Sequence, residues 1–164
     1  SALPDTLNKK YEFRILGASI EQVKQLCEEY NINYNSIKDN IVAEGRVSRD
    51  RVIEVYQLAH YSFLLRNSEE RYAKAGFPSK IVESVTYGVP PVLNLSSDLD
   101  LYLEDGHNCF VSKDLTMESL TDTISRAINI GEKDYMTLAK NTKTTAERFF
   151  DLSTYTQEFL TILE

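Results

Sequence analysis

Short apolar runs of strand type alternate with longer segments of helical periodicity along most of this 164-residue chain. The runs that predict strands lie at 11–16, 41–43, 61–65, 91–95 and 109–111. Parallel strands need a crossover between them, usually a helix, so the alternation predicts a parallel sheet with helices on both faces. We therefore expect an α/β fold with a doubly wound, mainly parallel sheet and additional C-terminal helices, in a single domain across 1–164.

The charge and cysteine content narrow the classes of function. A net charge of -7 and a pI near 4.9 leave no basic stripe for binding nucleic acid without sequence preference. Cys27 and Cys109 lie far apart in different patterns, which indicates reduced thiols in a cytoplasmic protein. Neither His60 nor His107 has a second ligand at metal-binding spacing, so no metal site is expected.

A loop, a short helix and a buried strand are predicted between residues 75 and 93, with features that suit phosphate. Pro78 fits the first turn of the helix, and Gly88 fits the position just past its end. The free N–H groups and positive dipole end of such a helix attract phosphate, and Lys80 adds a cation. Glu83, one turn further on the same face, could accept hydrogen bonds from a ribose diol. Taken alone, Lys80 and Glu83 favour a surface ion pair instead.

Further candidate residues follow the predicted strands. Ligands of a doubly wound sheet bind at the carboxyl ends of its strands. Gly17, the segment 45–47 and Arg66 occupy those positions in this interpretation. Arg66 could contact phosphate or remain a solvated loop residue. Ser97-Asp98 is more simply explained as the cap of a short helix than as a ligand contact.

An ordered succession of motifs resembles a known family. The motifs are Gly76-Phe77-Pro78-Ser79-Lys80-x-x-Glu83, Gly88-x-Pro90, Ser97-Asp98-Leu99 and Asp105-Gly106-x-Asn108. From about Tyr11 to Ile128 the chain is similar to the C-terminal, donor-binding domain of retaining group 1 (family 4) glycosyltransferases of the two-domain GT-B architecture. The resemblance implies a Rossmann-like fold, a nucleoside-diphosphate-sugar as the donor substrate, no other cofactor and no metal.

The resemblance also assigns roles to residues. Glu83 would be the second acid of the family's E-x₇-E motif, which holds the ribose hydroxyls, whereas the first acid would fall at Ala75, which is not acidic. The base would lie against the loop Gly45-Arg46-Val47, and Arg66 would point at the diphosphate or the donor sugar. The predicted catalytic groups are Lys80 and Arg66, and the predicted donor-binding residues are Glu83, Ser79, Pro78, Phe77, Gly76, Gly17, Arg46 and Val47.

The resemblance finally bears on the whole protein. Such enzymes carry an acceptor-binding domain before the donor domain, so we expect this chain to be the distal part of a larger enzyme and inactive alone. The expected acceptor is a glycan or lipid-linked precursor of a polysaccharide, such as capsule or O-antigen. The resemblance leaves room for peripheral attachment at the inner face of the membrane and for a homodimer of the fragment. The alternatives are a non-catalytic nucleotide-binding or scaffold module and, disfavoured because no acidic cluster follows the first strand, a phosphoacceptor receiver domain.

Overall fold

A computed structural model describes residues 11–67, 70–71 and 76–156, and within them every strand pairing is parallel. The prediction of a mainly parallel α/β fold is confirmed. The hydrogen bonding, however, divides the strands between two sheets, of order β1-β2 and β3-β4-β5, rather than joining them in one. The chain likewise divides into two compact units, with the boundary between Val55 and Tyr56.

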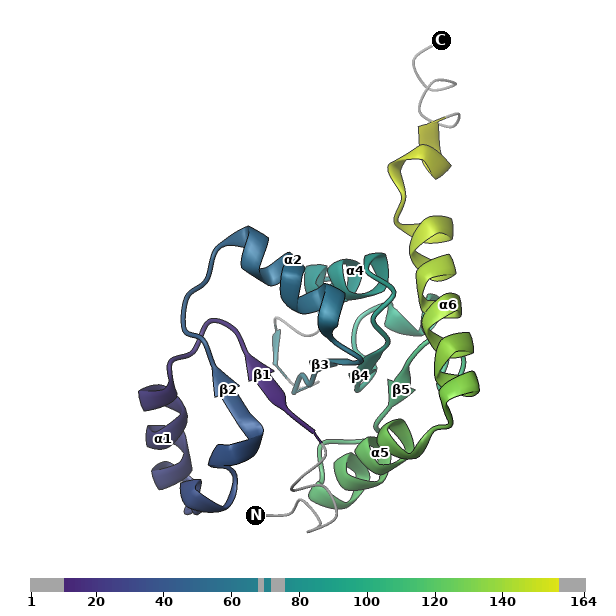
Figure 1. Cartoon of the computed structure of the whole chain (residues 1–164). Helices are drawn as coiled ribbons and strands as arrows, with labels where there is room; N and C mark the ends of the chain where they lie inside the picture. The colour runs from purple at the N-terminus through teal and green to yellow at the C-terminus, as the bar shows by residue number, and fades with distance from the viewer. Residues whose placement is uncertain (1–10, 68–69, 72–75, 157–164) are drawn as a thin grey trace. The chain divides into compact units, whose positions relative to one another are not determined.

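The first unit holds the two-stranded sheet and helix α1, which lies beside β2 (Figure 1). Its elements are β1 (Phe13–Ile15), α1 (Ile20–Glu29), the short 3-10 turns η2 (Tyr34–Ser36) and η3 (Lys38–Asn40), β2 (Ile41–Ala43) and the greater part of α2 (Arg49–Leu58). Ser19 caps α1 by accepting from the Gln22 amide, and the Gln22 side chain accepts from the Ser19 amide in return.

The second unit is a layered arrangement around the three-stranded sheet. Its strands and helices are β3 (Ser62–Leu64), α4 (Ser79–Thr86), β4 (Pro91–Leu93), β5 (Phe110–Val111), α5 (Met117–Asn129) and α6 (Glu132–Phe149), with 3-10 turns η4 (Leu99–Leu101) and η5 (Leu152–Tyr155). Successive residues of a strand point to opposite faces. Accordingly, Leu93 packs in a cluster with Ile81 of α4, and Val92 packs in another with Ala127 of α5. Both faces of this sheet are therefore covered, as predicted.

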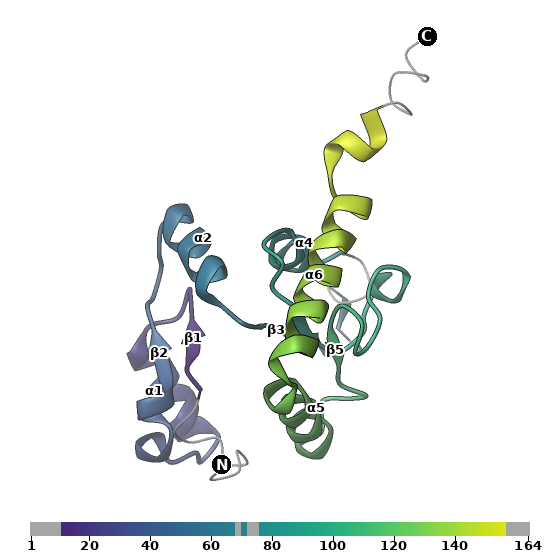
Figure 2. The ribbon, with the colours of Figure 1, turned by 45° about the vertical axis from the view of Figure 1, so that its right-hand side comes forward.

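Helix α6 takes part in both layers of the second unit. It lies beside α4 in both views (Figures 1 and 2). Its Leu138 belongs to the cluster of Val92, whereas its Ala146 belongs to the cluster of Leu93. One long helix thus connects two cores that the sheet separates.

The predicted capped helix after β4 is wrong. The chain forms only the 3-10 turn η4 there, and its N-cap, Asp98, makes no side-chain capping bond. Ser97 has a φ of +53°, in the left-handed region, so Ser97 itself is not part of a right-handed helix.

Cys27 and Cys109 are both free, and both are buried. Burial raises the pKa of the Cys109 thiol to about 12. The thiol therefore stays protonated and serves as a small core residue.

Candidate functional site

The start of helix α4 is the centre of the predicted site. Pro78 is the N-cap, one position earlier than predicted, with φ −77° and ψ 108°. The helical hydrogen-bond ladder opens with Ile81 N–H donating to Pro78 O at 2.9 Å, so the amides of Ser79 and Lys80 precede it. Because Ile81 is almost completely buried and Lys80 is exposed, the helix is anchored through one side while the cation reaches solvent.

The far end of α4 fixes its length and leaves Glu83 beside Lys80. Gly88 lies just past the helix with a φ of +69°, a conformation that glycine adopts without the steric cost of a Cβ. Its N–H donates to Val85 O at 3.0 Å, as the sequence predicts for a C-terminal stop. Glu83 is half-buried, three residues after Lys80, and therefore lies on the same face of the helix.

Arg66 is brought to this helix start from the end of β3. Its Nη1 donates to the carbonyl of Gly76, at 3.0 Å, two residues before the N-cap. The structure thereby places together two predicted site residues that are ten positions apart in the sequence. A guanidinium at a helix N-terminus combines a permanent cation with the positive end of the dipole, an arrangement that suits an anion.

Phe77 packs against other aromatic side chains of the second unit. Its ring centroid lies 5.5 Å from that of Tyr102 and 5.6 Å from that of Phe150. The same cluster includes Phe149, whose ring lies 5.3 Å from that of Tyr102. These contacts tie the entrance of α4 to the end of α6, so the Phe77 ring serves to hold the loop in place. Sequence reasoning missed this role because the partners are distant in sequence.

The remaining predicted residues lie in the first unit, where two loops meet. Gly17 N–H donates to Gly45 O at 2.7 Å, and Gly45 N–H donates to Ala18 O at 2.9 Å. The loops after β1 and β2 are therefore in direct contact. Arg46 is exposed and Val47 is half-buried, and both follow Gly45 immediately. The structure thus gathers Gly17, Arg46 and Val47 in one unit and Arg66, Gly76–Lys80 and Glu83 in the other.

A charged cluster beside the Gly45 loop was missed by sequence reasoning. The Glu44 carboxylate accepts from Arg51 Nε at 2.7 Å and from Arg51 Nη2 at 2.9 Å, and it also accepts from Arg14. These hydrogen bonds, chiefly those from Arg51, lower the pKa of Glu44 to about 2. The cluster joins β1, the end of β2 and α2, so it fixes the base of the loop that carries Arg46 and Val47. The sequence signal was the placement of Glu44 directly after a strand.

Lowering the pH is expected to reduce the free energy of unfolding of the first unit, because Glu44 becomes protonated and loses its ionic hydrogen bonds to the arginines. The folded-state pKa is depressed, so its stabilisation is fully present above the ordinary value of 4.5 and is lost as pH falls toward 2. Glu44→Gln should therefore reduce the difference in free energy of unfolding between pH 7 and pH 3.5, measured by urea denaturation. Glu28→Gln, an exposed carboxylate on α1, is the matched control and should keep the full difference. An unchanged difference in Glu44→Gln would contradict the assignment.

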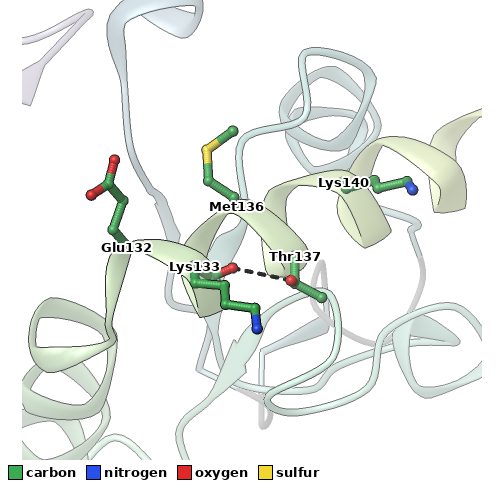
Figure 3. A pocket seen from close by; sticks show the side chains of 5 residues that line it. All are labelled: Glu132, Lys133, Met136, Thr137 and Lys140. Carbon is green, nitrogen blue, oxygen red and sulfur yellow. Dashed lines mark hydrogen bonds between the residues drawn. The ribbon is translucent and has the colours of Figure 1, made fainter.

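A shallow hollow lies elsewhere, on the exposed side of α6. It is lined by Glu132, Lys133, Met136, Thr137 and Lys140 (Figure 3). Thr137 Oγ1 donates to Lys133 O at 3.0 Å, a bond within the helix itself. The hollow contains none of the predicted site residues and presents the ordinary surface of a helix.

The described residues contain neither a candidate metal site nor a candidate membrane-spanning helix. No three His, Cys, Asp or Glu side chains gather there in a way that could hold a metal ion. Within the same part of the chain, no helix combines the length and the apolarity that crossing a bilayer requires.

Solved structures of similar fold include glycosyltransferases. HepE (Alr3699) of Anabaena in complex with UDP superposes with a TM-score of 0.72 and 20% identity, over 98% of this chain and 42% of that chain. A glycosyltransferase of Rickettsia africae gives 0.71 and 14%, over 96% and 40%. WaaG, a glycosyltransferase involved in lipopolysaccharide biosynthesis, gives 0.65 and 18%, over 99% and 40%. This chain therefore spans about two fifths of the length of these structures.

Comparison at the level of sequence identifies the family. No curated protein sequence matches the chain. The sequence profile of the family described as Glycosyl transferases group 1 matches residues 1–145. Since that match covers well over half of its length, the chain belongs to the group 1 glycosyltransferases.

Proposed function

We propose that this chain is the donor-binding domain of a metal-independent, retaining glycosyltransferase that binds a nucleoside-diphosphate-sugar. The observation that carries the proposal is the hydrogen bond from Arg66 to Gly76 O at the entrance of α4. This bond holds the Arg66 guanidinium two residues before the N-cap of α4, and the first turn of the same helix carries Lys80. The group 1 family match supports transfer of a sugar as the overall activity.

In this proposal, the residues at the start of α4 stabilise the diphosphate as it leaves the sugar. As the bond to the anomeric carbon breaks, negative charge grows on the diphosphate oxygens. The amides of Ser79 and Lys80, the Lys80 ammonium and the Arg66 guanidinium would stabilise that charge without reorganisation. Glu83 would accept hydrogen bonds from the ribose hydroxyls and so orient the nucleoside. The loop with Gly17, Arg46 and Val47 would hold the base.

The finer identity of the substrates rests on the neighbours. HepE was solved with UDP and with UDP-glucose, which makes a uridine nucleotide the first donor to test. WaaG is involved in lipopolysaccharide biosynthesis, which supports a polysaccharide or O-antigen type of acceptor for this protein too. We further propose that the acceptor site lies in another part of a longer enzyme, that the chain alone is inactive, and that the full enzyme works at the cytoplasmic face of the membrane.

Calorimetric titration tests donor binding directly. UDP, GDP and dTDP are each titrated into the full-length protein, with and without magnesium. We expect one nucleoside diphosphate to bind at least tenfold more tightly than the others, about 1.4 kcal/mol, and magnesium to leave its affinity unchanged. No binding of any of the three, or binding only with magnesium, would contradict the proposal.

A non-catalytic nucleotide-binding or scaffold module is the second candidate, because Ala75 stands where the family has its first acid. Such a module would bind the nucleotide in the same titration but release no nucleoside diphosphate from the sugar nucleotide. Measuring nucleotide release in the presence of acceptor extracts therefore separates the two functions.

A further inference from the structure

The way in which Arg66 is held points to a residue that no motif singled out. The parallel ladder of β3 and β4 ends with Leu64 opposite Leu93. Arg66 lies two residues beyond this last pair, where strand pairing no longer fixes the main chain. The Asn94 side chain holds the main chain of Arg66 instead. The Arg66 N–H donates to Asn94 Oδ1 at 2.8 Å, and Asn94 Nδ2 donates to Arg66 O at 2.7 Å.

This pair of hydrogen bonds uses both ends of the Asn94 carboxamide. Asn94 is only 7% exposed, and it directly follows the fully buried Leu93, so its own position is firmly set. The bonds use an acceptor and a donor on two separate atoms of one short side chain, a combination that serine, aspartate and alanine do not have. Removing the amide would leave the N–H and C=O of Arg66 without these partners.

We infer that Asn94 is a positioning residue for Arg66 in donor binding; the inference rests on the proposed function. Asn94 fixes the base of a long, flexible side chain, and the Arg66 Nη1–Gly76 O bond of 3.0 Å fixes its tip. With both ends held, the guanidinium stays at the entrance of α4 before the donor arrives. Without Asn94, ordering Arg66 would be left to the act of binding, which weakens affinity for the diphosphate.

A double-mutant cycle on UDP affinity in the full-length protein tests the inference. Asn94→Ala is expected to weaken UDP binding about tenfold, and Arg66→Ala to weaken it by at least as much, since each removes part of the same charge-assisted contact. In the Arg66→Ala background, Asn94→Ala should then have no further effect. GDP or dTDP replaces UDP if the unchanged protein binds one of these more tightly.

Asn108→Ala is the matched control for general destabilisation. Asn108 is a second buried asparagine of the same unit, and it accepts from Glu104 N–H at 2.8 Å and donates to Tyr102 O at 2.9 Å. Its loss should lower the melting temperature while leaving UDP affinity unchanged. Should Asn94→Ala fail to fold, Asn94→Ser, which can keep one of the two bonds, is expected to weaken UDP binding less than tenfold.

The possible outcomes separate the inference from the proposed function. If Arg66→Ala weakens UDP binding and Asn94→Ala or Asn94→Ser does not, the inference is overturned and the proposed function stands. If the loss caused by Asn94→Ala persists in the Arg66→Ala background, Asn94 acts only through general structure and the inference is again overturned. If Arg66→Ala leaves UDP affinity unchanged, Arg66 does not make the proposed phosphate contact, and the inference about Asn94 is overturned as well.

Discussion

Lys80→Ala is expected to lower the turnover number of the full-length enzyme at least tenfold, about 1.4 kcal/mol in the activation barrier. Lys80 is an exposed cation in the first turn of α4, next to amides that precede the helical ladder. In the proposed function, the attraction between its ammonium and the diphosphate would be strongest as the diphosphate leaves, because the negative charge on the phosphate oxygens is then greatest. The measurement is steady-state release of nucleoside diphosphate at saturating donor, so that a change in the turnover number is seen apart from a change in KM.

Lys140→Ala provides the matched control for Lys80. Lys140 is also an exposed lysine on a helix, and it lines the shallow hollow of α6, which contains none of the predicted site residues (Figure 3). Its removal changes the net charge by the same amount and should leave turnover unaltered. Equal turnover numbers for Lys80→Ala and the unchanged enzyme would remove Lys80 from the catalytic assignment.

Leu93→Ala is expected to lower the free energy of unfolding by roughly 2 to 5 kcal/mol, the usual cost of a large-to-small change in a core. Leu93 has no exposed surface and lies in β4, the central strand of its sheet, against Ile81 and Val85 of α4. Removing its side chain leaves a cavity beneath the helix that carries Lys80 and Glu83. Urea denaturation followed by far-ultraviolet circular dichroism measures the loss.

Leu95→Ala is the control, because it makes the same substitution at a more exposed position. Leu95 lies two residues further along and is 40% exposed, so its truncation should change stability by less than about 1 kcal/mol. A Leu93→Ala variant as stable as Leu95→Ala would show that the cluster beneath α4 does not hold the unit together.

The elements that could be predicted from sequence carry local signals. Short apolar runs marked the strands, the Ser19 capping box marked the start of α1, and Gly88 marked the end of α4. Each signal depends on residues within one turn or one strand, where the physics is set by neighbours in sequence. The same reasoning placed Arg66 near the start of α4, since the ends of parallel strands share one edge.

The features that escaped prediction depend on partners far apart in the chain. Asn94 is separated from Arg66 by 28 positions, and Glu44 from Arg14 by 30, so no local pattern reveals either contact. The division into two sheets is likewise a matter of which strands pair, and periodicity carries no information on pairing. The roles of Lys80, Glu83 and the Gly45 loop in donor binding stay predictions, because they concern a ligand.

Because helix α6 packs in both hydrophobic clusters, it affects how the second unit unfolds. Since Leu138 belongs to one hydrophobic cluster and Ala146 to the other, neither layer can loosen without disturbing a helix on which its counterpart depends. We therefore expect the two cores to unfold together rather than one at a time. The N-terminal end of α4, where we propose that the diphosphate binds, is therefore held in part by a helix outside the proposed site.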